Sequence, residues 1–210
     1  MRKDYKVPFR TRESIRTIAL RVRDYIGNSV DELVQNVNAY FRKLATEPIL
    51  KTGLVKIVFI APGPQEAPAY ITYKPTTLHV DKEIWDEAES GEPKARFILA
   101  HELGHVLLHD HHAQLFSEEK SGIWREEESS EWQADCFAEE LLITESALRE
   151  FVAPAAVAIY CSVERSVVVR RFGKTLRSSG DACPNCGNFS VVCYGAQERC
   201  DVCGKSPMSA

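Results

Sequence analysis

The sequence predicts an α+β fold in which a mainly helical domain with a small β-sheet, residues 1–177, precedes a short cysteine-rich module, residues 178–210. Three observations carry this prediction. Apolar residues recur at helical spacing in several long segments. Runs rich in β-branched residues lie between residues 54 and 80. Of the seven cysteines, five fall after residue 180, which sets the C-terminal module apart from the rest.

In chain order, the first half combines helical and β-type patterns. Two amphipathic helices are predicted at residues 11–26 and 29–45, separated by a Gly-Asn pair. A capping box from Ser29 to Glu32 favours the start of the second helix. Three short β-rich runs follow and predict a small sheet, with strands at residues 54–61, 69–74 and 76–80.

In the second half, helices dominate. An apolar helix is predicted at about residues 94–109, and a charged, irregular loop over 110–128 follows it, long enough to suggest a role at the mouth of a cleft. A second strong helix is predicted from about residue 129 to residue 143. Two shorter helices, separated by Pro154, are predicted near residues 145–152 and 163–173, the latter capped by Ser162.

Composition and charge narrow the class of protein. The 210 residues are 44% hydrophobic and 27% charged, as in a globular protein with a packed core. A charged N-terminus with no apolar stretch behind it argues against a signal peptide, and no segment reaches the roughly 18 apolar residues of a membrane span. We therefore expect a cytoplasmic protein with no membrane contact. The net charge of −4 argues against direct nucleic-acid binding, although residues 2–23 are basic and residues 118–140 are acidic.

The first apolar helix carries His101, Glu102 and His105. Two histidines four residues apart lie one turn apart on the same helix face, so both imidazoles can bind one zinc ion. Glu102 flanks the first histidine, so its carboxylate could take the proton of an attacking water. Because the surrounding residues are apolar, these polar groups need a partner, and a metal provides one.

A catalytic zinc ion usually has three protein ligands and one open position. The candidates for the third ligand are Glu131, His111, His112 and the carboxylates of residues 126–128. His111 lies where metzincins place a third histidine, but that arrangement needs a glycine where this chain has Leu108, and a methionine turn that this chain lacks. Residues 126–128 have no regular scaffold. Glu131 begins a helix that must pack beside the motif helix, so it is the preferred ligand.

Asp135 lies one turn after Glu131 and shares its helix face. Its carboxylate could accept a hydrogen bond from the second ring nitrogen of a ligand histidine, as groups around metal sites commonly do. The neighbouring Cys136 is expected to be a small core residue.

The C-terminal module contains two Cys-x-x-Cys pairs with thirteen residues between them. In a cytoplasmic protein such clustering indicates a metal site rather than disulfides. The spacing is that of a zinc ribbon, in which four thiolates hold one structural zinc ion. The predicted ligands of this second zinc are Cys183, Cys186, Cys200 and Cys203.

The segment from His101 to His109, followed by Glu131-x-Gln-Ala-Asp-x-Phe-Ala-x-Glu-Leu-Leu, resembles the ImmA/IrrE family of metallo-endopeptidases over approximately residues 30–175. The resemblance implies a gluzincin-like fold, zinc ligands at His101, His105 and Glu131, and Glu102 as the catalytic base. It also implies a protein substrate, because members cleave or inactivate helix-turn-helix repressors of the XRE type, often in mobile elements or stress responses.

The sequence departs from the family pattern in two places. Ile143 and Thr144 stand where a proline commonly follows the Leu-Leu pair, and Thr144 can cap the next helix. Many relatives carry their own N-terminal helix-turn-helix, and residues 1–50 show none, so a separate repressor is the expected partner. His109 matches the family pattern and is expected to be structural or to face the substrate.

The sequence offers several candidates for the oxyanion donor and more than one function. The oxyanion of a hydrolytic reaction needs a donor besides zinc, for which His109, His112 and Tyr160 are candidates. The main alternative function is a regulatory protein that binds and sequesters a repressor without cleaving it. A nucleic-acid binder that uses the ribbon and the basic N-terminus is a further alternative, and the acidic net charge weighs against it.

Overall fold

The computed structural model describes most of the chain, which forms two compact units, Met1–Leu142 and Ile143–Ala210. The predicted domain boundary between residues 177 and 178 lies outside the described residues and stays a prediction. The described residues are 4–25, 35–48, 53–61, 67–109, 125–144, 147–148, 154–172, 191–194 and 197–204, together with Gly180, Cys186 and Asn188.

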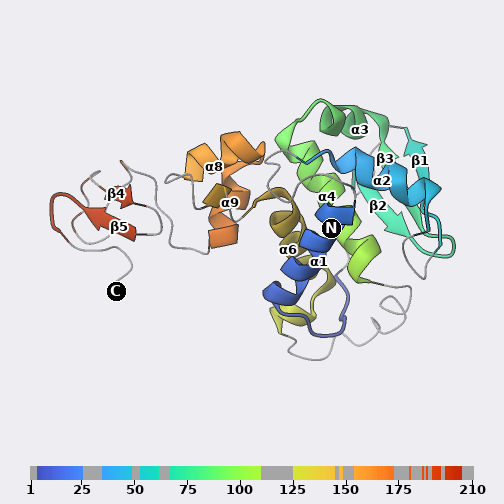
Figure 1. The fold of residues 1–210 in the computed structure, drawn as a ribbon, viewed down its shortest axis with the longest axis horizontal. Coiled ribbons are helices and arrows are strands. Elements are labelled where there is room, and N and C mark those ends of the chain that lie inside the picture. The colour runs from blue at the N-terminus through green and yellow to red at the C-terminus, as the bar shows by residue number, and fades with distance from the viewer. Residues whose placement is uncertain are drawn as a thin grey trace. The chain divides into compact units, whose positions relative to one another are not determined.

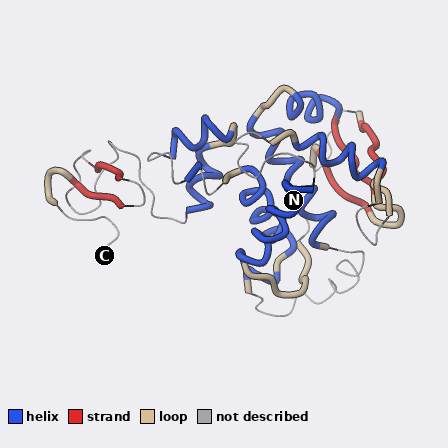
Figure 2. Tube along the Cα trace, in the orientation of Figure 1, coloured by secondary structure: helices blue, strands red, loops and turns tan. Residues whose placement is uncertain are grey.

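The first unit is mainly helical with one small sheet, which confirms the α+β class (Figures 1 and 2). Its last helix, α6, packs against both α1 and α4, and α4 in turn contacts strand β2. In chain order its elements are α1 (Arg12–Tyr25), α2 (Val37–Thr46), β1 (Lys56–Ile60), β2 (Ala69–Thr72), β3 (Thr77–Asp81), α3 (Lys82–Glu89), α4 (Pro93–Leu108), the 3₁₀ turn η1 (Glu126–Glu128) and α6 (Ser130–Leu142).

The sheet has three strands in the order β1-β3-β2. Strand β1 runs parallel to β3, and β2 runs antiparallel to it. Leu78 and Val80 of the central strand β3 are fully buried, as is Ala69 of β2. Side chains alternate between the two faces of a strand, so these residues tie one face of the sheet to the helices.

Helix α4 begins at a well-defined cap. The Glu92 carboxylate accepts hydrogen bonds from the backbone N–H groups of Lys94 at 2.7 Å and Ala95 at 3.0 Å. Pro93 occupies the first helical position, where its missing N–H costs nothing. The helix ends with His109 as its C-cap, and most of its residues are buried. A helix that is apolar on nearly all sides belongs in the interior of a fold.

Helices α4 and α6 approach closely at Gly104. A methyl group added at Gly104 would lie 3.0 Å from the Cα atom and 3.2 Å from the carbonyl oxygen of Ala134, and 3.2 Å from Cβ of Phe137. A side chain here would be tighter than nearly all real Cβ contacts, and the neighbouring backbone would have to shift by a few tenths of an ångström to admit it. The two helices that carry the motif residues are therefore in direct backbone contact.

The N-terminal segment holds the start of α6. The Ser129 hydroxyl caps the helix by accepting from the Trp132 N–H at 3.0 Å. The Asp4 carboxylate accepts from the hydroxyls of Ser129 and Ser130 and from the Glu131 N–H at 3.2 Å. A negative charge at this position also suits the positive end of the helix dipole.

Helix α1 is joined to α6 by a cluster of ion pairs. Arg12 contacts Glu139 at 2.8 Å and Glu140 at 3.2 Å, and Arg16 contacts Glu140 at 3.0 Å. Both carboxylates are buried, so these partners provide the compensation that buried charges require. The Cys136 thiol nearby is buried as predicted, and burial raises its pKa to about 12.

The second unit contains α8 (Pro154–Cys161), α9 (Arg165–Phe172) and the antiparallel pair β4 (Val191–Tyr194) and β5 (Gln197–Cys200). Helices α8 and α9 pack against each other. Val191 and Cys200 form a small buried cluster with Cys203 packed against it. Within the described residues of both units, no helix has the length and apolar character needed to cross a membrane.

Four predictions of secondary structure need correction. Ser162 does not cap the last helix, which begins at Arg165; the Ser162 N–H donates to the Ile159 carbonyl at the end of α8 instead. The second helix begins at Val37 rather than residue 29, because the Asn36 side chain accepts from the Ala39 N–H at 3.1 Å and caps it there; the predicted capping box lies outside the described residues. Helix α3, capped by Asp81, was missed because its eight residues are too few for a clear period. Pro154 begins α8 instead of separating two helices, since proline suits a first turn.

The close contact at Gly104 leads to a prediction for Gly104→Ala. Alanine gains about 1 kcal/mol of helix propensity over glycine, but forcing an extra methyl into a packed contact costs about 1–3 kcal/mol. The neighbour is backbone and cannot rotate away, so we expect a net loss of stability in denaturant unfolding. Lys94→Ala, at an exposed position of the same helix, is the control. An unchanged or raised unfolding free energy for Gly104→Ala would show that the helices can separate without cost.

Candidate metal centre

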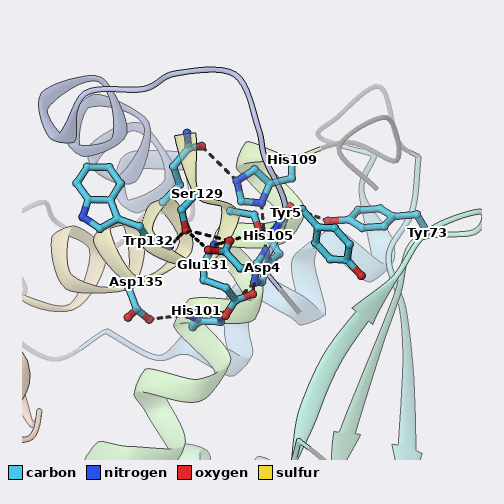
Figure 3. Close-up of polar contacts among 12 residues, drawn as sticks. Asp4, Tyr5, Tyr73, His101, His105, His109, Ser129, Glu131, Trp132 and Asp135 are labelled. Carbon is cyan, nitrogen blue, oxygen red and sulfur yellow. Dashed lines mark hydrogen bonds and ion pairs between the residues drawn. The ribbon is translucent and has the colours of Figure 1, made fainter. Parts of the chain in front are cut away.

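The ring nitrogens of His101 and His105 converge with the carboxylate of Glu131 (Figure 3). The Nε2 atoms of the two histidines on α4 lie 3.0 Å apart. The Oε2 atom of Glu131 lies 3.4 Å from Nε2 of His101, and its Oε1 atom lies 3.2 Å from Nε2 of His105. Two helices far apart in sequence thus bring three metal-binding atoms to one place.

The geometry and chemistry of this group fit a zinc ion. Atoms held at about 2.0–2.2 Å by one tetrahedral ion lie roughly 3.4 Å from one another, close to the separations of 3.0, 3.2 and 3.4 Å found here. Two imidazoles and one carboxylate form a donor set typical of catalytic zinc. A tetrahedral zinc ion held by these three residues would keep a fourth position for a water molecule or substrate.

Asp135 fixes the orientation of His101. Its Oδ1 atom lies 2.8 Å from Nδ1 of the His101 ring (Figure 3). A carboxylate accepts at this distance, so Nδ1 carries the proton and the lone pair of Nε2 faces the other ligands. The structure therefore places Asp135 where the sequence predicted a supporting carboxylate.

His105 has a different partner at the equivalent nitrogen. Its Nδ1 atom lies 3.1 Å from Nδ1 of His109, and Nε2 of His109 lies 3.2 Å from Oε1 of Gln133. Burial, and then the neighbouring His105 ring, lower the pKa of His109 to about 3, so this ring is neutral near neutral pH. Sequence reasoning missed Gln133, although its position two residues after Glu131 on a helix that faces the motif was a possible signal.

The Glu131 carboxylate is ready to bind a cation. Burial raises its pKa, but the close contacts with the imidazole rings of His101 and His105 lower it by more, so the pKa lies well below the ordinary value for glutamate. Glu131 therefore stays ionised, as a metal ligand must be. Its backbone is held by Asp4, as described above.

Glu102 is 4% exposed and follows His101 on α4. Its expected role as the base that accepts a proton from water stays a prediction. Residues 126–128 form the turn η1 and are exposed or half-buried, outside the group of three ligands. His111 and His112 lie outside the described residues, and Tyr160 is half-exposed on α8 of the second unit.

Three of the four predicted ribbon cysteines come together in the second unit. The sulfur atoms of Cys186, Cys200 and Cys203 lie within 4.8 Å of one another, and those of Cys186 and Cys200 are 3.7 Å apart. The Cys203 N–H points at the Cys200 sulfur at 3.5 Å, a contact that would stabilise a thiolate. Cys183 lies outside the described residues, so the four-cysteine zinc ribbon stays a prediction.

A His-Glu-x-x-His helix packed against a second helix that supplies a carboxylate defines a metallopeptidase-like domain. A family model described as the IrrE N-terminal-like domain, Peptidase M78, matches residues 57–167, and the chain belongs to this family. The match confirms the resemblance predicted from the paired motifs. It leaves α1 and the N-terminal segment, which hold α6 in place, outside the matched region.

One solved structure with a similar fold is named Mycobacterium tuberculosis transcriptional regulator. Its TM-score is 0.50 at 16% sequence identity, and the alignment covers 79% of this chain and 48% of that chain. This chain thus corresponds to about half the length of that protein, and the likeness concerns the fold alone. A search of curated proteins gave no match.

The converging ligands predict how zinc content responds to Glu131→Ala. Elemental analysis should give two zinc ions per chain for the wild type and one for Glu131→Ala, because the cysteine site is independent of α6. Glu126→Ala removes an exposed carboxylate near the same helix start and should keep two. One zinc ion per chain in both the wild type and Glu131→Ala would show that His101 and His105 hold no metal.

Proposed function

We propose that the protein is a zinc-dependent endopeptidase of the cytoplasm that cleaves an XRE-type helix-turn-helix repressor and so regulates a mobile element or a stress response. The observation that carries the proposal is the convergence of His101, His105 and Glu131 on one point, with Glu102 in the same helix. Membership of the Peptidase M78 family supports the same reaction class.

In this proposal each residue of the site has one task. His101, His105 and Glu131 hold a zinc ion, which would lower the pKa of a bound water molecule towards about 7 and polarise the scissile carbonyl group. Glu102 accepts the proton of the attacking water and passes it to the leaving amine. Asp135 keeps His101 in the tautomer that binds through Nε2.

The choice of partner rests on two observations. The family resemblance implies a DNA-binding repressor as the substrate. The similar solved structure carries the name of a transcriptional regulator, which supports a setting in transcriptional control. The second zinc ion, held by Cys183, Cys186, Cys200 and Cys203, is proposed to be structural.

The test of the reaction is Glu102→Gln. Glutamine has nearly the same shape but cannot accept the proton of water, so we expect cleavage to fall by about 10²–10⁴-fold. The substrate for the assay is a purified XRE-type repressor from the same organism, and fragments are followed by mass spectrometry. Zinc content should stay at two ions per chain in the variant.

Two outcomes would contradict the proposal. Unchanged cleavage by Glu102→Gln would remove Glu102 from the role of base. Release of the repressor from its DNA by both the wild type and Glu102→Gln, with no fragments in either case, would favour the alternative of a regulatory protein that sequesters the repressor. A DNA-release assay and a fragment assay on the same samples separate the two functions.

A further inference from the structure

A continuous line of buried polar groups runs from His105 away from the ligand cluster. It passes from His105 to His109 at 3.1 Å and from His109 to Gln133 at 3.2 Å. The Gln133 side-chain nitrogen then contacts the carbonyl oxygens of Pro8 at 2.8 Å and Glu127 at 2.7 Å. His109 is 5% exposed and Gln133 is fully buried, so water does not compete for these contacts.

The two backbone carbonyls determine the proton positions along this line. A carbonyl oxygen can only accept, so the Gln133 atom that faces both of them must be the NH₂ group. The Gln133 oxygen therefore faces His109 and can only accept. Nε2 of His109 must then carry a proton and donate it to Gln133.

The proton on His109 in turn determines where His105 carries its own proton. A neutral imidazole has one N–H and one lone pair, so a proton on Nε2 of His109 leaves Nδ1 as an acceptor. Nδ1 of His105 faces that acceptor and must donate. The lone pair of His105 is thereby left on Nε2, the atom that lies 3.0 Å from Nε2 of His101 and 3.2 Å from Glu131.

We infer that His109 and Gln133 are positioning residues that fix His105 in the one tautomer able to bind the metal, with the Pro8 and Glu127 carbonyls as their anchors. The inference rests on the proposed metal site and assigns part of its affinity to residues that do not touch the ion. Asp135 does the same for His101 by a single contact. The two ligand histidines are thus oriented by different means, a carboxylate for one and a chain of neutral groups for the other.

This line of hydrogen-bonded groups also gives the N-terminal segment a function. Pro8 lies 49 residues before the start of the family match at residue 57, yet its carbonyl is one of the two acceptors that orient Gln133. The same segment pairs with the residues before α6 through hydrogen bonds from Val7 to Glu128 at 2.8 Å and from Arg10 to Glu127 at 3.2 Å. The metal centre of this chain therefore extends beyond the family domain.

The test compares zinc affinity in full-length variants by competition with a chelator. His109→Leu replaces the imidazole with an apolar side chain of similar size and removes the acceptor. The dissociation constant for zinc should therefore rise by about 10–100-fold. In His109→Asn an amide oxygen can take the place of Nδ1, and affinity should stay near that of the wild type. Asp135→Ala removes the partner of His101. It shows how much the zinc dissociation constant rises when the other ligand histidine loses its hydrogen-bond partner. Glu131→Ala binds zinc at the cysteine site alone, so it gives the part of the competition signal that comes from that site.

A spectroscopic readout separates orientation from packing. In zinc-loaded protein with ¹⁵N-labelled histidine, Nδ1–H of His105 should exchange slowly with water in the wild type and in His109→Asn. It should exchange rapidly in His109→Leu, because the proton has lost its acceptor. Thermal unfolding of the same samples shows whether either substitution disturbs the fold.

Equal zinc affinity in His109→Leu and the wild type would overturn the inference, as would a loss in His109→Asn as large as that in His109→Leu. The result does not depend on catalysis. A wild-type protein that holds zinc at His101 and His105 but cleaves no repressor contradicts the proposed function. It does not contradict the positioning role of His109 and Gln133. A wild-type protein that holds no zinc there overturns both.

Discussion

The site depends on the direct contact between the backbones of α4 and α6 at Gly104. Each helix alone carries only part of the ligand set, and the separation of their axes decides whether the parts meet. Because Gly104 has no side chain, Ala134 approaches to a distance at which a methyl group would lie 3.0 Å from its Cα atom. Glu131 and Asp135, one turn apart on α6, then reach both histidines. A wider separation would leave buried polar groups without partners, which is costly.

Around this contact, the rest of the first unit keeps α6 in place. Asp4 accepts from the first N–H groups of the helix, and Arg12 and Arg16 of α1 hold the buried carboxylate of Glu140 near its end. Strand β2 and helix α3 also pack against α4. Ligand positions are thus set by regular elements with packed neighbours, which is what precise metal geometry requires. This explains why residues outside the family match contribute to the centre.

Much of the site could be predicted because its key spacings are local. His101 and His105 share a helix face by their separation, and Glu131 and Asp135 do the same, so two short motifs predict four residues that the structure brings together. The link through His109 and Gln133 to Pro8 joins three segments that are distant in sequence, and no local period encodes it. For the fold, long apolar helices were predicted closely, whereas the short helices α3 and α8 depend on packing and capping that a pattern does not reveal.

The central claim is that α4 and α6 together hold a metal ion. Anomalous diffraction at the zinc absorption edge, from crystals of the zinc-loaded full chain, tests it most directly. We expect a peak about 2.0–2.2 Å from the Nε2 atoms of His101 and His105 and from an oxygen of Glu131. Zinc peaks at the cysteines alone, with His101, His105 and Glu131 bonded only to one another, would contradict it.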